Sequence, residues 1–556
     1  MSVTDDRALW GTSVSRRDGD IPFLCYSPRR RHVIELLTDA ARWSDRTHLI
    51  QGARRLSFAA VFAAAERVAA RFTEAGLRPG DRLLLLAPNS PEWVISLWAG
   101  LRVGAIVALG NGWWSGPLVA HAVGLTSPRL VLADGKRAAL VPDGGTVITV
   151  DEVRACVDAA AGPAGGAGAA EAPGAAVEAG APPTAPPGDE DDPAVIIFTA
   201  GTTGAPKPVV LAHRSVIANL HNLLVMSRRL PHQVDESRPA AVSLQSGPLF
   251  HIGGLQSLLL ALLGGNTLVF LEGRFEPGQV LDVIERERVT WWGAVPTMAS
   301  RVLAHPSIGD RDLSSVRSVS MGGAPVQPAL VTRLREAFPN ASRGMSTIYG
   351  MTETGGTVAA ASGVTMAEHP TTAGAPLPVV DLRIDAPNAD GDGEIVVRTP
   401  GQMIGYWGGA PDGAGTDLID DLIDTDGWVH TGDLGRVVDG LLYVTGRIKD
   451  LIIRGGENIA PAHVEAVLLR HPSVRNVAVL GLPDADLGER VAAVVQLEPG
   501  AQVAEQELAE FAAAELASYE RPADWWLRTD ELPMQDSGKT DKLTLRATWP
   551  APAAQT

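Results

Sequence analysis

The chain has 556 residues, of which 45% are hydrophobic and 20% charged, so it can bury a large core and form two or more domains. Its formal net charge of -17, from 64 acidic against 47 basic residues, argues against wrapping nucleic acid or lying on an anionic membrane. Two cysteines, Cys25 and Cys156, cannot build a disulfide framework, and neither stands in a cluster with zinc-ligand spacing. We therefore expect a protein of the reducing cytoplasm.

Neither the start of the chain nor its most apolar stretch has the pattern of a membrane segment. Residues 1–20 carry charges without the apolar core of a secretory signal. Residues 83–110 are interrupted by prolines and by charged side chains, so they are too polar to cross a bilayer. We expect no secretory signal and no membrane span.

Strand and helix patterns alternate along most of the chain. A leucine run at 83–87 stops at a Pro-Asn-Ser-Pro-Glu segment, helical spacing follows, and a second apolar run covers 105–109. The same order recurs from 267 to 295, where apolar runs at 267–271 and 289–295 flank a helical stretch at 280–288. A run at 316–321 precedes a helical pattern at 328–338. This alternation predicts an α/β fold with parallel sheets covered by helices.

Composition divides the chain into parts. Residues 159–192 collapse into Ala, Gly and Pro, which predicts a flexible insertion because such a segment cannot recover its ordering entropy. A new pattern begins near Arg447, with helical spacing at 464–469 and 504–517 and strand-like runs at 474–480 and 491–497. We predict a large N-terminal domain over 1–446 and a small C-terminal domain over 447–556.

The clearest candidate site lies at 196–207, where a β-branched strand leads into the loop Thr-Ala-Gly-Thr-Thr-Gly-Ala-Pro-Lys. Glycines let the backbone approach an anion, hydroxyls donate hydrogen bonds, and a lysine adds charge, so the loop is a candidate phosphate cradle. It is not a P-loop, because Pro206 precedes Lys207 and no hydroxyl follows it. The candidate phosphate-binding residues are Thr199, Gly201, Thr202, Thr203, Gly204 and Lys207.

Further motifs follow in chain order. Gly-Gly-Ala-Pro at 322–325 precedes Tyr-Gly-Met-Thr-Glu-Thr at 349–354, which offers an aromatic face for a purine, a hydroxyl for a phosphate and a carboxylate for Mg²⁺. Asp433 is suited to two ribose hydroxyls. The motif 446–450 at the predicted boundary is followed by 454–459, and Lys539 lies on a Gly-containing loop. Three of the five lysines of the chain, Lys207, Lys449 and Lys539, fall inside these motifs.

These motifs, taken together and in this order, resemble the adenylate-forming superfamily of acyl-CoA synthetases, adenylation domains and firefly luciferase. The resemblance spans nearly the whole chain. It implies a large N-terminal domain of parallel-rich sheets with helices and a β-barrel-like subdomain, together with a small mobile α+β C-terminal domain. The implied function is an AMP-forming acyl-CoA synthetase that uses ATP, Mg²⁺ and coenzyme A to convert a carboxylic acid into its thioester.

The resemblance also implies a role for each matching residue. Lys539 bridges the carboxylate and the α-phosphate, Thr352 contacts the α-phosphate, and Glu353 holds Mg²⁺. Lys449 is the hinge about which the C-terminal domain rotates, which withdraws Lys539 and brings up a loop that lines a thiol tunnel. The ribose-binding pair is Asp433 and Arg447. The other expected nucleotide- or CoA-binding residues are Gly323, Ala324, Pro325, Tyr349, Gly350, Met351, Gly455, Gly456 and Glu457.

Two positions depart from the family pattern, which usually has Ser at Ala200 and Gly at Pro208. The first change removes a hydroxyl donor, and the second removes a backbone N–H. Each lost bond to phosphate would cost about 1.5–3 kcal/mol. An alternative is therefore an enzyme that forms the thioester from acyl-AMP but adenylates weakly or not at all.

The acyl partner is indicated by His251, which stands where amino-acid-activating relatives place an aspartate. Without a carboxylate to pair a substrate ammonium, the expected substrate is a non-amino acid with an aliphatic, aryl or polycyclic tail. His251 is itself a candidate for orienting or gating the acyl group. The pair Trp291 and Trp292 is expected to pack in the core. A wide acyl pocket is expected where Gly253, Gly254, Gly293 and Gly323 form its rim.

Three other functions share these motifs. A luciferase-like oxygenase would use the same fold and adenylate step, and a degenerate nucleotide-binding protein would bind without turnover. A phosphopantetheinyl carrier protein could also replace coenzyme A, since the thiol arm is the same. We expect no nucleic-acid partner.

Overall fold

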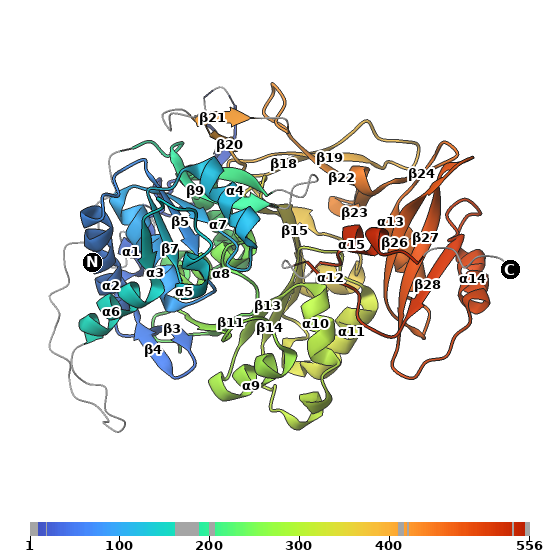
Figure 1. Ribbon diagram of the computed structural model, residues 1–556, viewed down its shortest axis with the longest axis horizontal. Coiled ribbons are helices and arrows are strands. Elements are labelled where there is room, and N and C mark those ends of the chain that lie inside the picture. Colours follow the sequence, from blue (N-terminus) through green and yellow to red (C-terminus); the bar gives the residue numbers. More distant parts are fainter. Residues whose placement is uncertain are drawn as a thin grey trace.

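The computed structural model describes residues 9–17, 19, 21–161, 188–199, 206–409, 416–419, 422–535 and 539–550. The chain folds into a large N-terminal body and a smaller C-terminal domain, which lies at the right of Figure 1 in orange and red. The predicted insertion at 159–192 falls for the most part outside the described residues, between helix α6 (Val150–Ala161) and strand β9 (Pro193–Thr199).

Two large sheets form the N-terminal body, and most of their strand pairs are parallel. The first sheet has eight strands in the order β21-β20-β10-β9-β6-β5-β7-β8, with bounds β5 (Arg82–Leu86), β6 (Ile106–Leu109), β7 (Leu130–Ala133), β8 (Val147–Thr149), β10 (Lys207–Ala212), β20 (Gly405–Gly409) and β21 (Thr416–Ile419). The second has nine strands in the order β17-β16-β15-β14-β13-β11-β12-β3-β4, with bounds β3 (Thr47–Gln51), β4 (Arg54–Ser57), β11 (Val242–Gln245), β12 (Thr267–Phe270), β13 (Trp291–Ala294), β14 (Ser318–Met321), β15 (Met345–Met351), β16 (Gly356–Ser362) and β17 (Ala375–Pro376).

Helices cover these sheets as the alternating pattern predicts. In the first sheet, Leu83 and Leu85 of β5 join one apolar cluster with helices α2, α3 and α6, whereas Leu84 and Leu86 join another with α4. One face of the second sheet packs on α9, α10 and α11. The helices of this body are α1 (Glu35–Ala40), α2 (Phe58–Glu74), α3 (Pro91–Val103), α4 (Gly116–Thr126), α5 (Gly135–Ala138), α7 (His213–Ser227), α8 (Ile252–Leu263), α9 (Pro277–Glu287), α10 (Pro296–Leu303), α11 (Pro328–Ala337) and α12 (Gly363–Glu368).

A third sheet of the N-terminal body is antiparallel, with strands in the order β18-β19-β22-β23. Its bounds are β18 (Asp381–Asp385), β19 (Gly393–Arg398), β22 (Val429–Val438) and β23 (Leu441–Arg447). The expected barrel-like subdomain is corrected here, because the end strands β18 and β23 do not pair in the described part of the chain and the sheet stays open. A short hairpin of β1 (Ser13–Arg16) and β2 (Leu24–Ser27) completes this body.

The C-terminal domain has its own core around a five-stranded sheet. Its elements are β24 (Ile452–Arg454), β25 (Glu457–Ile459), α13 (Pro461–Leu468), β26 (Val474–Asp484), β27 (Gly488–Leu497), α14 (Glu505–Glu515), β28 (Asp524–Arg528) and α15 (Lys542–Ala547). The mixed α and β content matches the expectation. The exact boundary at residue 447 stays a prediction.

Candidate active site

The predicted site residues lie at or just after the carboxyl ends of strands of both large sheets, β9 in the first and the neighbours β14 and β15 in the second. Thr199 ends β9, Gly323 comes two residues after β14, and Tyr349 lies near the end of β15. In parallel sheets, loops at the carboxyl ends of strands meet and form binding crevices. Tyr349 contacts Asp433 of β22, so the open antiparallel sheet brings its own polar side chains to the same place.

Tyr349, Asp433 and Arg447 form one hydrogen-bonded group. The hydroxyl of Tyr349 donates to Oδ2 of Asp433 at 2.8 Å, and Nε of Arg447 donates to Oδ1 of the same carboxylate. Burial, reinforced by the charge of Asp433, raises the pKa of Tyr349 well above its ordinary value, so the hydroxyl keeps its proton. Asp433 and Arg447 face each other in register on β22 and β23, which places their side chains side by side.

Glu353 lies at the centre of a second group. Its Oε1 accepts hydrogen bonds from Thr199 at 3.4 Å and from Tyr406 at 3.2 Å. The ammonium of Lys207 lies 5.0 Å from the centre of the Tyr406 ring, within the range of a cation–π contact. Burial raises the pKa of Glu353, since a desolvated carboxylate is disfavoured without a cation.

The donor set around Glu353 fits Mg²⁺. Both described hydroxyl contacts fall on Oε1 of this buried carboxylate, and Mg²⁺ prefers one or two carboxylate oxygens together with substrate phosphates. The described residues contain no group of three or more His, Cys, Asp or Glu side chains that could hold a metal by themselves. A magnesium ion would therefore need the phosphates of a nucleotide to complete its coordination.

Lys539 reaches from the C-terminal domain into this site. A Cβ atom added to Gly323 would lie 3.9 Å from Cε of Lys539, and Gly323 has a φ of +78°, a conformation that favours glycine. Although Lys539 stays exposed, the surrounding protein partly desolvates its ammonium, and this effect together with the charge of Arg447 lowers its pKa, which the carboxylates of Asp433 and Glu353 oppose. Lys539 thus lies beside Gly323 and within electrostatic reach of both groups described above.

His251 lies between β11 and helix α8, next to the same lysine. Burial lowers the pKa of His251 to about 4, and the charge of Lys539 acts in the same direction. Its Nε2 atom is buried and has no hydrogen-bond partner among the described residues. The imidazole is therefore neutral at physiological pH and carries a polar atom available to a ligand.

The other predicted residues of the large domain form the loops of this site. Thr352 accepts a turn hydrogen bond from the N–H of Gly355, and Thr354 fixes the turn by bonding the backbone of Met351. Gly350 and Met351 end β15. Ala324 and Pro325 follow Gly323 in the loop after β14.

Several predictions fall elsewhere or outside the described residues. Gly455 and Gly456 are the two central residues of the β24–β25 hairpin, with φ values of +58° and +91° as a tight turn requires. This hairpin, with Glu457 on its second strand, belongs to the sheet of the C-terminal domain, and Gly455 bonds Leu487 there. Lys449 is exposed in a short 3-10 turn. The positions Ala200, Gly201, Thr202, Thr203 and Gly204 lie outside the described residues.

The tryptophan pair and the glycine rim differ from the expectation. Trp292 is fully buried in the core, but Trp291 points to the opposite face of β13 and stays partly exposed. A Cβ atom on Gly293 would lie 2.8 Å from Cη2 of Trp291, and one on Gly254 would lie 2.2 Å from the carbonyl oxygen of Pro248. The space beside two of the four rim glycines is therefore already filled: Trp291 shares a face of β13 with Gly293, since residues two apart on a strand lie on the same side, and the backbone of Pro248 lies against Gly254 in α8.

Sequence reasoning missed Tyr406. This residue lies in β20, far from every motif, and reaches Glu353 only because β20 pairs with β10 next to the candidate phosphate loop. The chain has only five tyrosines, and two of them, Tyr349 and Tyr406, are in the site. That scarcity is the one signal in the sequence that could have drawn attention to it.

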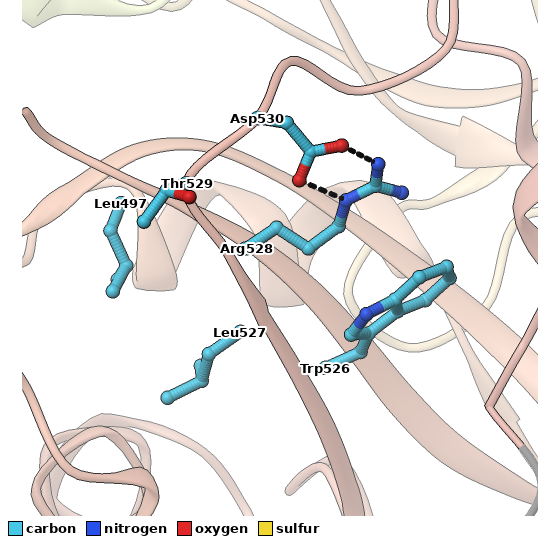
Figure 2. A pocket seen from close by; sticks show the side chains of 6 residues that line it. All are labelled: Leu497, Trp526, Leu527, Arg528, Thr529 and Asp530. Atoms are coloured by element: carbon cyan, nitrogen blue, oxygen red, sulfur yellow. Dashed lines mark hydrogen bonds and ion pairs between the residues drawn. The ribbon is translucent and has the colours of Figure 1, made fainter.

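A pocket of about 310 Å³ lies elsewhere, in the C-terminal domain (Figure 2). It is lined by residues at the ends of β27 and β28, and Figure 2 shows Arg528 paired with Asp530. The guanidinium of Arg528 also lies 4.6 Å from the centre of the Trp526 ring. Its charged groups satisfy one another, and no predicted site residue lines it.

Comparisons with known proteins agree with this geometry. The model of the AMP-binding enzyme family matches residues 36–407, and that of the AMP-binding enzyme C-terminal domain matches residues 463–539. The chain is 35% identical to a feruloyl-CoA synthase of Amycolatopsis sp. (90% of this chain, 95% of the relative). It is 32% identical to a fatty acid–[acyl-carrier-protein] ligase of Streptomyces coeruleorubidus (89% and 91%).

Among solved structures, the fold is similar to that of the o-succinylbenzoate CoA synthetase of Bacillus subtilis in complex with its acyl-adenylate intermediate. The TM-score is 0.73 and the identity 29%, over 92% of this chain and 97% of that one. In the described part of the chain, no helix has the length and apolar character needed to span a membrane.

Proposed function

The chain belongs to the AMP-binding enzyme family and is an AMP-forming acid–thiol ligase, and on that premise we propose how its own residues divide the reaction. A carboxylate oxygen attacks the α-phosphorus of ATP and expels pyrophosphate, which gives an acyl-adenylate. The sulfur of coenzyme A then attacks the acyl carbon, loses its proton and expels AMP. The observation that carries the assignment is that Lys539 lies beside Gly323, within electrostatic reach of the Tyr349–Asp433–Arg447 and Glu353–Thr199–Tyr406 groups.

In the first step, two anions must approach each other, so positive charge has to lie between them. Lys539 is placed for this role, since its ammonium stands near Gly323 on the acyl side and near Arg447 on the nucleotide side. Thr352 contacts the α-phosphate from the turn after β15. Thr199 and Lys207 flank the loop that receives pyrophosphate. Glu353, together with the nucleotide phosphates, would hold Mg²⁺, which would supply positive charge to the leaving pyrophosphate.

The Tyr349–Asp433–Arg447 group orients the nucleoside. The ring of Tyr349 offers a face to the purine, and Asp433 and Arg447 grip the ribose. Because Tyr349 and Arg447 already fix both carboxylate oxygens of Asp433, the acceptor pair is preorganised. His251, neutral and with Nε2 available, orients the acyl group or gates the approach of the thiol.

The second step requires a different position of the C-terminal domain. We place its hinge at Lys449, in the exposed 3-10 turn between β23 and β24. Rotation there would withdraw Lys539 and bring the Gly455–Gly456 hairpin, with Glu457, to the thiol path. The position of Lys539 beside Gly323 supports this division, because it is the arrangement that the first step needs.

Pro208 bears on whether the enzyme adenylates. It is buried in β10 opposite Phe198, past the end of the phosphate loop, so its missing N–H would have lain in the plane of the sheet. This position supports retained ATP use over the variant limited to thioester formation. We place the enzyme in the cytoplasm, where ATP and coenzyme A are supplied.

The test is to mix the purified protein with ATP, Mg²⁺ and a panel of non-amino carboxylic acids, with and without coenzyme A. We expect pyrophosphate release with a matching acid, and AMP with an acyl-CoA once coenzyme A is added. Thioester formation from preformed acyl-AMP without any ATP-dependent pyrophosphate release would favour the thioester-only variant. Loading of a carrier protein in preference to coenzyme A, or oxygen uptake with light emission, would contradict the proposal.

A further inference from the structure

The face of β13, β14 and β15 that lies opposite the apolar core indicates how deep the acyl site is. This inference rests on the proposed function. Trp292 belongs to the apolar core on one side of the second sheet, so Trp291 and Gly293 lie on the other side. Gly293 pairs with Ser320 of β14, and Ser320 pairs with Ser346 of β15. Gly293, Ser320 and Ser346 stay partly exposed although their strands lie in the interior of the sheet, so this face is open.

This face leads directly to the reacting groups. Val295 follows β13, and its Cγ1 would lie 3.5 Å from a Cβ atom on Gly323, which in turn would lie 3.9 Å from Cε of Lys539. A carboxylate held by Lys539 therefore starts beside Val295. Its tail has the open face of β13 in front of it, running back toward Gly293.

The indole of Trp291 closes that path. Its Cη2 and Cζ3 atoms would lie 2.8 and 3.3 Å from a Cβ atom on Gly293, so the ring covers the face of β13 at the glycine. Gly293 is two residues before Val295, so at about 3.3 Å per residue the indole lies about 7 Å along the strand from Val295. The residues that pair with Gly293 on the two neighbouring strands do not close the path. Ser320 has a short side chain, and the amide of Gln245 donates a hydrogen bond to the carbonyl of Gly247.

The strand cannot easily shift to relieve this limit. The hydroxyl of Ser246 donates to the carbonyl of Gly293 at 3.0 Å and accepts from Nε1 of Trp292 at 3.0 Å. The backbone beside the indole is thus fixed by a buried tryptophan on the far face. A longer tail would have to displace the Trp291 ring itself.

We propose that Trp291 is a specificity-determining residue that forms the floor of the acyl site and restricts the enzyme to compact acids, either single-ring aryl acids or short aliphatic ones. Phenylpropenoic acids, in which two further carbons separate the ring from the carboxylate, meet the indole. The glycine at 293 provides a flat surface on which the indole rests, and it does not widen the pocket.

The experiment compares wild type with Trp291→Ala across benzoate, butyrate, cinnamate, ferulate and octanoate, by the rate of acyl-CoA formation. We expect wild type to favour benzoate or butyrate. The variant should raise kcat/KM for the longer acids by about tenfold or more relative to the compact ones, as expected when pocket space for one or two carbons is gained. Trp291→Phe, which keeps a smaller aromatic ring at this position, should give an intermediate ratio, and it provides a second test if the alanine variant folds poorly.

Trp98→Phe is the matched control, since it alters a fully buried indole in α3, away from β13, and should leave the ratio of long to compact acids unchanged. A wild type that already prefers ferulate over benzoate would overturn the inference. So would equal ratios in wild type and both Trp291 variants while thioesters are formed. Failure of every protein to form a thioester from any acid would instead count against the proposed function.

Discussion

Asp433 is the residue on which nucleotide binding depends in this account. Its two oxygens are held by Tyr349 and Arg447. We expect Asp433→Ala to raise the KM for ATP about 10- to 100-fold, because a hydrogen bond to a charged group is worth about 1.5–3 kcal/mol and the mutation also frees Arg447. The KM for ATP is measured from the rate of pyrophosphate–ATP exchange at varied ATP concentrations.

Tyr349→Phe is the companion variant, since it removes one donor to Asp433 and keeps the aromatic face. We expect a change in KM of less than about fivefold, because the lost bond orients Asp433 and is not itself made to the nucleotide, and Arg447 still holds the carboxylate. An unchanged KM in Asp433→Ala, or a larger effect from the phenylalanine than from the alanine substitution, would contradict the roles given to this pair.

At the scale of elements, one ion pair joins helix α10 of the large domain to the C-terminal domain. Arg301 bonds Glu531, and both side chains are partly exposed. Such a pair is worth about 0.2–1 kcal/mol, so Arg301→Glu should slow the adenylation step by about two- to fivefold by releasing the domain from the position that presents Lys539.

The reciprocal double variant Arg301→Glu/Glu531→Arg should restore the rate measured by pyrophosphate–ATP exchange. Arg288→Glu is the control, because Arg288 pairs with Asp312 inside the large domain and should have no effect. A double variant as slow as the single one would show that this pair does not hold the domain.

Most elements were predictable because their pattern is local. The leucine run at 83–87 corresponds to β5 (Arg82–Leu86), and the helical spacing at 328–338 corresponds to α11 (Pro328–Ala337). The elements that depend on distant pairing were not predictable. β20 and its Tyr406 reach the site through β10, and the facing direction of Trp291 depends on which side of β13 carries the core. The barrel-like subdomain implied by the resemblance was wrong for the same reason, since closing the sheet requires a pairing of β18 with β23 that no local pattern specifies.

At the scale of the whole molecule, buried histidines set how stability depends on pH. Burial lowers the pKa of His48, His213, His221 and His251 to about 4, from an ordinary value of 6.5. Between these values the unfolded chain binds protons that the folded chain does not. Their contribution to stability is therefore complete above pH 6.5 and is lost as the pH falls toward 4.

We expect the urea midpoint to fall steeply over that interval, with each histidine contributing of the order of 1–3 kcal/mol. His48→Gln should flatten the slope, since His48 is fully buried. His430→Asn is a control of opposite sign: Nδ1 of His430 donates a hydrogen bond to the carboxylate of Glu394, which raises the pKa of His430, so its stabilisation is lost as the pH rises. A pH-independent midpoint from 6.5 to 4 would contradict this assignment.

The central claim is that Lys539 serves the adenylation step from the C-terminal domain and is withdrawn for the thioester step. The direct measurement is Lys539→Ala assayed separately for pyrophosphate–ATP exchange and for thioester formation from preformed acyl-AMP. Lys542→Ala serves as the control, because Lys542 lies in the same segment and pairs with Glu465 within the small domain. We expect exchange to fall about 10²- to 10³-fold, the typical cost of removing a group that stabilises developing charge, while thioester formation stays within about twofold of wild type. Equal loss of both half-reactions, or loss of neither, would contradict the account.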